Sequence, residues 1–550
     1  MVSLGCAKNL VDAEIMVGSL LRDGMEVVND PGEADALIVN TCSFIDAAQE
    51  ESVDTILESA EFRAGHRPGQ AVIVSGCLTQ RFRDELPSLL PEVDAFMGID
   101  QVEEVGRIVG EAVARRAGLE QAGAGVRKGK ADGGVGRKGA VKARLAALEA
   151  DPGKGGAAGG VGAGRGTEAR PGAGAGEGLA VEANRRPKYL PRWDSPRFRL
   201  TPRHFAYVKI AEGCNHPCSF CIIPRMRGSH RSRAQADIVE EARRLVGEGV
   251  RELNLISQDS TYYGMDLRPG HRRTISSPDR FAEATRAMGG DATTLGSLLE
   301  ALDGLSGDFW IRLLYTHPAH WTDGLIATMA GCRKVARYVD MPLQHIHDDM
   351  LARMRRETDG GYIRDLIGRL RAGIPGVALR TTFIVGFPGE TAAHFEALLG
   401  FLREARFERM GVFAYSKEDG TVAGRMAGQV PIRTRQRRRE RAMAEQHAVA
   451  REIAASFVGR EMRVLVEGKA TAEALAAARV QSWEHGLMRE AGTEGLPGKR
   501  RSYWVGRGEA DAPDIDGRVY LTRPAPVGEF VTVRVIGHTD YDLIAEPAAE

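Results

Sequence analysis

The sequence predicts an α/β chain with three folded units: an amino-terminal parallel-sheet domain, a partial TIM-like barrel and a small carboxyl-terminal β-barrel. Three observations support this prediction. The chain has 550 residues, which is too many for one compact core. Strand-like apolar runs alternate with helical periodicity through most of its length. A glycine-rich stretch of low complexity separates the first unit from the second.

The composition is that of a water-soluble globular protein. Hydrophobic residues make up 43% and charged residues 27% of the chain, and no run approaches the roughly 18 apolar residues that cross a bilayer. The first residues have no basic region followed by an apolar stretch and a cleavage site. Lys and Arg number 74, as do Asp and Glu, so no global positive field attracts nucleic acid. We expect a cytoplasmic protein that does not contact a membrane.

Residues 1–115 are predicted to form the parallel-sheet domain. Apolar runs at residues 2–4, 35–40 and 71–75 are separated by helical stretches, as in strands joined by crossover helices. The segment 121–180 contains 19 glycines and no aromatic residue, so it cannot bury enough surface to offset its ordering entropy. We therefore expect a disordered insertion or linker over residues 116–196.

Residues 197–432 are predicted to form the partial barrel. Six strand-like runs with helices between them lie at residues 206–211, 252–258, 309–316, 338–341, 378–387 and 408–414. Six such units fit an incomplete TIM-like barrel. In these barrels the chemistry takes place at the carboxyl ends of the strands, so residues that directly follow a strand are the candidates for function.

A connecting helix is expected over residues 433–458 and a small β-barrel over residues 459–550. The helix begins with a basic run, residues 433–441, which could bind RNA, although a charged helix is more often a solvated face. The last unit has 12 Lys and Arg against 15 Asp and Glu, a net charge of minus 3. This balance suits a basic protein partner better than a phosphate backbone, and leaves direct RNA binding as a secondary possibility.

Cys214, Cys218 and Cys221 directly follow the first predicted barrel strand. Three thiolates can bind three irons of a four-iron cluster and leave the fourth iron open, as a catalytic metal site requires. The alternative is a structural zinc site with His216 as fourth ligand, but zinc usually takes paired C-x-x-C ligands. The C-x-x-x-C-x-x-C spacing favours the iron-sulfur cluster.

Cys6, Cys42 and Cys77 each directly follow a strand-like run of the first domain. The ends of neighbouring parallel strands meet at one edge of a sheet, so these thiols should converge there. A lone cysteine beside a strand is more often a small buried hydrophobic residue. Three cysteines in the same structural position instead predict a second three-thiolate cluster with an open iron.

The cysteine spacing on a partial barrel resembles the signature of the radical S-adenosylmethionine (SAM) superfamily. The resemblance implies that the open iron binds the amino and carboxylate groups of SAM, which the reduced cluster cleaves to a 5′-deoxyadenosyl radical. Phe220 matches the aromatic position whose backbone usually meets the adenine. Gln258, Gln344 and Gly386 end later strands and are plausible parts of the SAM pocket, although each could equally be a strand-ending turn.

The whole chain is similar to the methylthiotransferase family, which joins an amino-terminal cluster domain, a radical SAM barrel and a carboxyl-terminal TRAM barrel. Four segments resemble the branch that modifies a ribosomal protein, the RimO branch: residues 3–14, 212–224, 379–390 and 510–517. The branch that modifies tRNA, the MiaB branch, tends to begin with Gly-Cys-Gln-Met-Asn, whereas this chain has Gly-Cys-Ala-Lys-Asn.

The resemblance implies a function: methylthiolation of the β-carbon of an aspartate in the twelfth protein of the small ribosomal subunit. It implies two 4Fe-4S clusters, SAM as radical source and methyl donor, and an external electron donor. The alternatives are methylthiolation of a tRNA adenosine and, from another class, a non-catalytic electron carrier or a zinc-stabilised RNA-binding protein.

Overall fold

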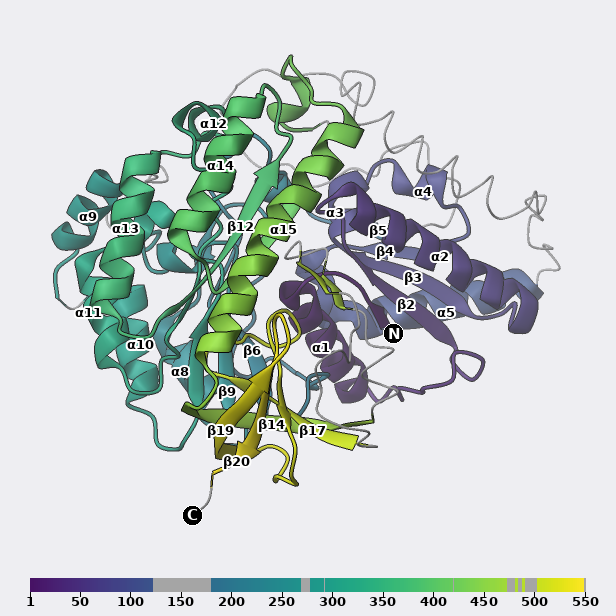
Figure 1. Cartoon of the computed structure of the whole chain (residues 1–550). Coiled ribbons are helices and arrows are strands. Elements are labelled where there is room, and N and C mark those ends of the chain that lie inside the picture. Colours follow the sequence, from purple (N-terminus) through teal and green to yellow (C-terminus); the bar gives the residue numbers. More distant parts are fainter. Residues whose placement is uncertain are drawn as a thin grey trace.

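The computed structural model describes residues 1–121, 180–268, 277–290, 292–418, 420–471, 480–482, 487–489 and 502–548. It confirms the predicted fold class. The parallel-sheet domain lies beside a partial barrel, and a small closed β-barrel lies below it (Figure 1). Most of the segment for which we expected disorder, residues 122–179, lies outside the described residues.

The amino-terminal domain contains a parallel sheet with the strand order β1-β2-β3-β4-β5. Its strands are β1 Val2–Ser3, β2 Ala36–Thr41, β3 Ala71–Gly76, β4 Ala95–Met97 and β5 Ala180–Glu182. The pairing of β2 with β3 runs from Ala36 opposite Ala71 to Thr41 opposite Gly76. These two strands therefore end level with each other, and the residues that follow them are neighbours in space.

Helices cover both faces of this sheet, so its strands are apolar on both sides. The helical segments are α1 Ala7–Arg22, α2 Asp46–His66, α3 Cys77–Phe82, α4 Leu86–Leu89, η1 Ile99–Glu104 and α5 Val105–Gln121. Ile38 and Ile73 pack on the face covered by α1 and α5. Val39 and Val74, one residue further along, pack on the opposite face under α2.

The strand β5 is a difference from the expected linker over residues 116–196. It pairs in parallel with β4, and the backbone N–H of Gly98 donates to the carbonyl of Glu182 at 2.6 Å. The helix α5 also continues to Gln121, beyond residue 115. Three residues are too few to show strand periodicity, and the glycine-rich composition beside them hides the signal.

Six parallel strands form the partial barrel at the expected positions. They are β6 Phe205–Lys209, β9 Glu252–Ile256, β10 Trp310–Leu313, β11 Tyr338–Asp340, β12 Ala378–Val385 and β13 Arg409–Ala414. They pair as β10-β9-β6 and β11-β12-β13, and a parallel bridge from Ile311 to Val335 joins the two halves. All the pairings within each half are parallel.

Helices surround the barrel and bury one apolar face each. The longer ones are α8 Gln235–Gly247, α9 Pro278–Ala287, α10 Leu295–Asp303, α11 Asp323–Gly331, α13 Gly360–Gly373 and α14 Ala392–Ala405. The shorter segments are α7 Ile223–Met226, η2 Ser260–Tyr262, η3 Pro318–His320, α12 Asp348–Arg353 and η4 Ala423–Arg425. In α8, for example, Ile238, Ala242 and Leu245 recur at helical spacing and enter the barrel core.

The carboxyl-terminal barrel is closed, in the order β14-β17-β18-β20-β19. Its strands are β14 Glu461–Thr471, β17 Ser502–Gly508, β18 Val519–Leu521, β19 Phe530–His538 and β20 Leu543–Pro547. A separate pair, β15 Val480–Ser482 and β16 Leu487–Arg489, is antiparallel. Closure removes the unpaired edges that an open sheet would expose.

The helix α15, Ile432–Ser456, runs along the partial barrel toward the small barrel (Figure 1). Several arginines of its basic run bind the partial barrel. Arg435 donates to the carbonyls of Val430 and Tyr415 at 2.7 and 2.8 Å, and Arg438 lies 2.8 Å from a carboxylate oxygen of Glu390. Much of the basic run therefore docks the helix, which weakens the case for RNA binding there.

None of the described helices is both long enough and apolar enough to cross a membrane.

Candidate active site

Three cysteines lie at the carboxyl edge of the amino-terminal sheet. Cys6 is the N-cap of α1 just after β1, Cys42 directly follows β2, and Cys77 is the first residue of α3 directly after β3. Because β1, β2 and β3 are neighbours, their ends bring the three thiols to one place.

Two glycines allow the backbones to approach so closely. Gly5 has a φ of 90°, and a Cβ atom there would lie 2.7 Å from the Cβ of Cys42. Gly76 has a φ of 95°, and a Cβ there would lie 2.5 Å from the carbonyl oxygen of Thr41. Only glycine adopts such a conformation and leaves this space, which explains the glycine immediately before Cys6 and before Cys77.

Side-chain hydrogen bonds fix the ends of these strands. The Nδ2 of Asn9 donates to the carbonyls of Leu4 and Thr41 at 3.0 and 2.8 Å. Its Oδ1 lies 3.7 Å from the Sγ of Cys77. Asn9 therefore ties the first two strand ends together and contacts the thiol at the third.

The other three cysteines lie on one loop of the partial barrel. The short strands β7 Ala211–Glu212 and β8 Arg231–Ser232 pair in antiparallel fashion and close the base of this loop. Within it the backbone N–H of Cys221 donates to the carbonyl of Cys218 at 3.2 Å. The Nη1 of Arg356 donates to the Sγ of Cys218 at 3.7 Å. The loop is thus held at the carboxyl end of β6, where barrel enzymes place their chemistry.

One cavity of about 290 Å³ joins the two groups of thiols. The cysteines that line it are Cys6, Cys42, Cys77, Cys214, Cys218 and Cys221, and among the described residues none of them is in a disulfide. The remaining cysteine, Cys332, is the C-cap of α11 and does not line this cavity. The structure thus brings together the six cysteines that the sequence selected.

Three of the four residues expected at a SAM pocket also line this cavity: Phe220, Gln258 and Gln344. Gly386 does not line it. It has a φ of 73°, and a Cβ there would lie 2.4 Å from the Cγ of Arg435. The close approach of α15 therefore accounts for this glycine.

The cavity also contains residues that the sequence did not single out. Arg227, Tyr315, Arg356 and Arg380 line it, and no motif distinguishes them from surface residues. Tyr315 and Gln344 have φ values of 60° and 73°, and backbone strain of this kind clusters at functional sites. Only Arg227 could have been suspected from the sequence, because it lies shortly after Cys221.

Burial raises the pKa of the Cys77 and Cys214 thiols, and it raises the pKa of Cys221 to about 12. Without a cation these buried thiols stay protonated. Bound iron balances the negative charge of the thiolates, and the thiol protons are released when the metal binds. Two sets of three convergent thiols therefore match the donor set of clusters that each keep an open iron.

Unpaired polar atoms around the cavity fit a polar cofactor. Gln258 Oε1, Arg356 Nε and Arg380 Nη2 are buried and make no hydrogen bond within the described structure. All three residues line the cavity. Buried polar atoms normally find a partner, and a molecule such as SAM, which carries amino, carboxylate and ribose groups, has the chemistry to supply one.

Among the described residues, His216 lies in a buried group of histidines with His317 and His320. Its Nε2 lies 2.7 Å from Asp259 Oδ2, and its ring stacks on His317 at 4.0 Å. His320 Nδ1 lies 3.0 Å from the same carboxylate oxygen of Asp259. Burial lowers the pKa of His216 to about 4, so a neutral ring donating to Asp259 accounts for its position.

Comparisons with known proteins match all three units. Residues 1–98 match the uncharacterized protein family UPF0004, residues 208–402 the radical SAM superfamily, and residues 494–547 the TRAM domain. The chain is 48% identical to ribosomal protein uS12 methylthiotransferase RimO of Opitutus terrae, over 100% of this chain and 96% of that protein. It is 42% identical to the RimO of Akkermansia muciniphila, over 99% of each chain.

A third protein of the same name, from Pelotomaculum thermopropionicum, is 38% identical over 99% of this chain and 98% of its own length. Radical SAM proteins hold a 4Fe-4S cluster and SAM, and the family match at residues 1–98 points to a second cluster. Identity of this degree over the full length, together with the geometry of the thiols, places the chain in a family: it is a member of the RimO family of radical SAM methylthiotransferases.

Proposed function

We propose that this chain attaches a methylthio group to the β-carbon of an aspartate in ribosomal protein uS12. The observation that carries the proposal is the single cavity lined by both sets of three thiols. Two sulfur-ligated metal sites that share one cavity bring a radical source and a sulfur donor within reach of the same carbon, which is the proximity that such a transfer needs. The relatives with a uS12 methylthiotransferase name support the choice of substrate.

In this proposal Cys214, Cys218 and Cys221 hold the cluster that binds SAM, while Cys6, Cys42 and Cys77 hold the second cluster. When bound, these groups supply a 5′-deoxyadenosyl radical and the methylthio group, whose methyl comes from a second SAM. Phe220, Gln258 and Gln344 contact SAM. For Gly386 the proposal is indirect: it lets α15 pack against the end of β12.

The chain itself provides a dry and shaped site. Phe44, Ile45, Ile223, Met226 and Phe413 line the cavity beside the thiols. Such an apolar lining excludes water and protects a reactive radical from side reactions. Polar and charged side chains, among them Arg227, Arg356 and Arg380, also line the cavity and can orient the substrate and the cofactor.

The proposal includes the partners. The substrate is a basic protein, and the net negative carboxyl-terminal unit suits it. An external donor supplies electrons, the enzyme acts in the cytoplasm without a membrane, and direct RNA binding is secondary. That last point is supported by the arginines of α15 that bind the partial barrel.

The decisive experiment gives the anaerobically reconstituted enzyme uS12 or tRNA in separate reactions and measures a methylthio addition by mass spectrometry. We expect addition to a uS12 aspartate. Addition to a tRNA adenosine alone would replace the substrate. In the same assay Cys218→Ala should abolish formation of 5′-deoxyadenosine, whereas Cys42→Ala should retain it and lose the methylthiolated product. If Cys218→Ala still formed 5′-deoxyadenosine, the cluster assignment would be wrong.

A further inference from the structure

Arg227 belongs to the loop that carries the cysteines of the partial barrel, but its guanidinium lies against the amino-terminal domain. Its Nη1 is 2.9 Å from the Oδ2 of Asp12 in α1, and its Nη2 donates to the Oδ1 of Asn9. The same Asn9 oxygen lies 3.7 Å from the Sγ of Cys77. The side chain is 2% exposed and lines the common cavity. One loop therefore holds one set of thiols and reaches the other.

The charges around Arg227 form a closed buried group. Lys209 bonds Asp12 and lies 3.0 Å from Glu212, and Arg227 Nη1 lies 3.4 Å from Glu212. The Oε1 of Glu212 accepts a hydrogen bond from the Nε2 of Gln258 at 2.5 Å. Two cations and two carboxylates balance, and each of these four side chains is at most 4% exposed. The group extends from the side of the cavity that holds Cys77 to Gln258, a proposed contact of SAM.

An arginine side chain stays charged in proteins, and the guanidinium of Arg227 faces two carboxylates, Asp12 at 2.9 Å and Glu212 at 3.4 Å. The guanidinium is therefore a permanent positive charge beside the amino-terminal thiols. Partners of this kind fix the orientation of metal ligands and tune the charge at the metal.

We infer that Arg227 is a positioning residue that the partial barrel contributes to the amino-terminal metal site: it holds Asn9 beside Cys77 and places a positive charge next to the sulfur ligands. That site is then complete only when the two domains are docked. The inference rests on the proposed function, because it takes Cys6, Cys42 and Cys77 as cluster ligands. It adds that the domain interface takes part in the chemistry of that cluster.

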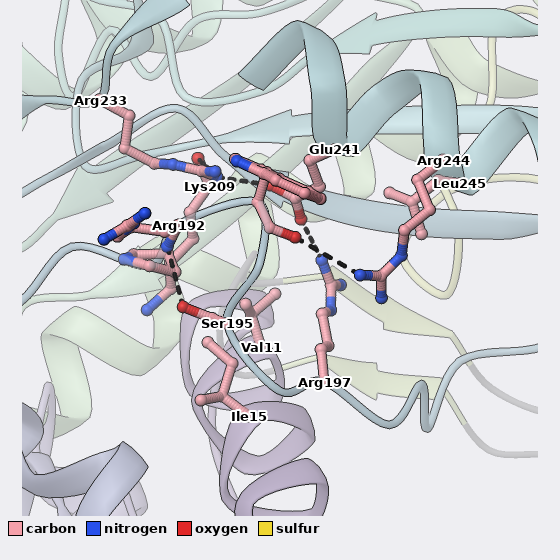
Figure 2. Close-up of a pocket in the computed structure, with 12 residues that line it drawn as sticks. Val11, Ile15, Arg192, Ser195, Arg197, Lys209, Arg233, Glu241, Arg244 and Leu245 are labelled. Atoms are coloured by element: carbon pink, nitrogen blue, oxygen red, sulfur yellow. Dashed lines mark hydrogen bonds and ion pairs between the residues drawn. The ribbon is translucent and has the colours of Figure 1, made fainter. Parts of the chain in front are cut away.

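A second buried ion pair between the same parts of the chain provides a matched control. Arg197, in the segment before β6, lies 2.6 Å from Glu14 of α1 and 2.6 Å from Glu241 of α8. Figure 2 shows Arg197 reaching toward Glu241 beside Val11 and Ile15 of α1. Arg197 is 7% exposed and Glu14 is fully buried. This pair resembles that of Arg227 with Asp12 in burial and in the helix it binds, but it touches no thiol.

The test uses the full chain with Cys214, Cys218 and Cys221 replaced by Ala, so that only the amino-terminal site can bind a cluster. Two quantities are measured. The first is the iron bound per chain after anaerobic reconstitution, and the second is the midpoint potential of the cluster, from a redox titration followed by electron paramagnetic resonance. Arg227→Gln should shift the potential to a lower value, since a lost positive charge disfavours adding an electron. It should also weaken iron retention about 10- to 100-fold, as loss of such a partner typically does.

Arg197→Gln in the same background should lower the thermal unfolding midpoint but leave the potential and iron retention unchanged. Arg227→Lys keeps the charge and loses the fork that reaches Asn9, so it should restore most of the potential but not the iron retention. Equal effects of Arg227→Gln and Arg197→Gln would overturn the inference, because the role of Arg227 would then be domain docking alone.

If Arg227→Gln does not fold, the charge-conserving pair Arg227→Lys and Arg197→Lys carries the test. Arg227→Lys loses the fork that reaches Asn9 and should weaken iron retention, whereas Arg197→Lys should leave it unchanged. Equal iron retention in the two variants would overturn the inference. If the background chain binds no iron before any of these changes, it is the proposed function that fails, which separates the two outcomes.

Discussion

Replacing Glu252 by Gln should sharply weaken the attachment of the carboxyl-terminal barrel. Glu252 begins β9 at the amino end of the partial barrel and is fully buried. Its Oε1 accepts from the Nε of Arg312 at 2.6 Å, and its Oε2 accepts from the Nη2 of Arg507 at 2.6 Å. Arg312 comes from the next strand, β10, and Arg507 from β17 of the small barrel, so one carboxylate joins the two units.

The cost of the change follows from what the two arginines retain. Arg507 keeps Glu467, 2.7 Å away. Arg312 keeps the carbonyl of Glu509 at 2.7 Å and the face of Tyr338, but among the described residues Glu252 is its one carboxylate partner. A fully buried guanidinium would thus lose its counter-charge. Removing one partner of a buried ion pair costs about 3–5 kcal/mol.

Tryptophan fluorescence during denaturant unfolding can measure this loss locally once the other four of the five tryptophans are replaced by Phe. Trp310 of β10 is 5% exposed and packs against Phe530 of the small barrel with ring centroids 4.6 Å apart, so its emission reports undocking. We expect the undocking transition of Glu252→Gln to move to lower denaturant by that free energy. Adding Arg312→Met should recover most of it, since it removes the buried guanidinium that was left without a counter-charge. A loss below about 1 kcal/mol, the value of a surface pair, would refute the reasoning.

Three further outcomes follow from the structure. Gly76→Ala places a Cβ 2.5 Å from the Thr41 carbonyl at a φ of 95°, so the iron bound by the amino-terminal site and the thermal unfolding midpoint should both fall. Gly110→Ala is the control, because nothing lies within 4 Å of a Cβ there, and it should leave the bound iron unchanged. Burial tends to raise the pKa of Glu467, but Arg507 and His204 lower it to about 2. The stabilising effect of this carboxylate is complete above its ordinary pKa of 4.5 and disappears as the pH falls toward 2. The denaturant midpoint of the wild type should therefore decline over that pH range more than that of Glu467→Gln. Arg438→Met removes the 2.8 Å ion pair with Glu390 and should loosen α15, which hydrogen exchange of the residues 432–441 would detect as faster exchange than in Arg433→Met.

The convergence of the thiols could be predicted because it depends on a simple rule of parallel sheets. Cys6, Cys42 and Cys77 each directly follow a strand, and strand order places them at one edge. The six barrel strands could be predicted as well, because strand-like runs recur there between helices. The short strand β5 was not, since Ala180–Glu182 gains its identity from pairing with β4 and not from its own pattern.

The remaining cavity residues depend on contacts between distant parts of the chain. Nothing local distinguishes Arg356, whose Nη1 meets Cys218 across 138 positions of sequence, from an arginine on a solvated helix. Gln344 was predicted from its place after a strand, but its φ of 73° was not, because it depends on the surrounding packing. Gly386 is the opposite case: it was expected at the cavity, but glycine is needed there because Arg435 of α15 packs closely against it.

The helix α1 explains why the first residues of the chain form a specific sequence motif. It buries Asn9, Asp12 and Glu14 within two turns, and polar residues so placed would be a poor choice for an isolated domain. Each has a partner in the described structure: Asn9 meets Arg227, Asp12 meets Lys209 and Arg227, and Glu14 meets Arg197. The polar pattern of this helix therefore serves the docking of the two domains, while Asn9 also joins strand ends of the first domain. The position of Cys6 at the start of the helix links that docking to the metal site.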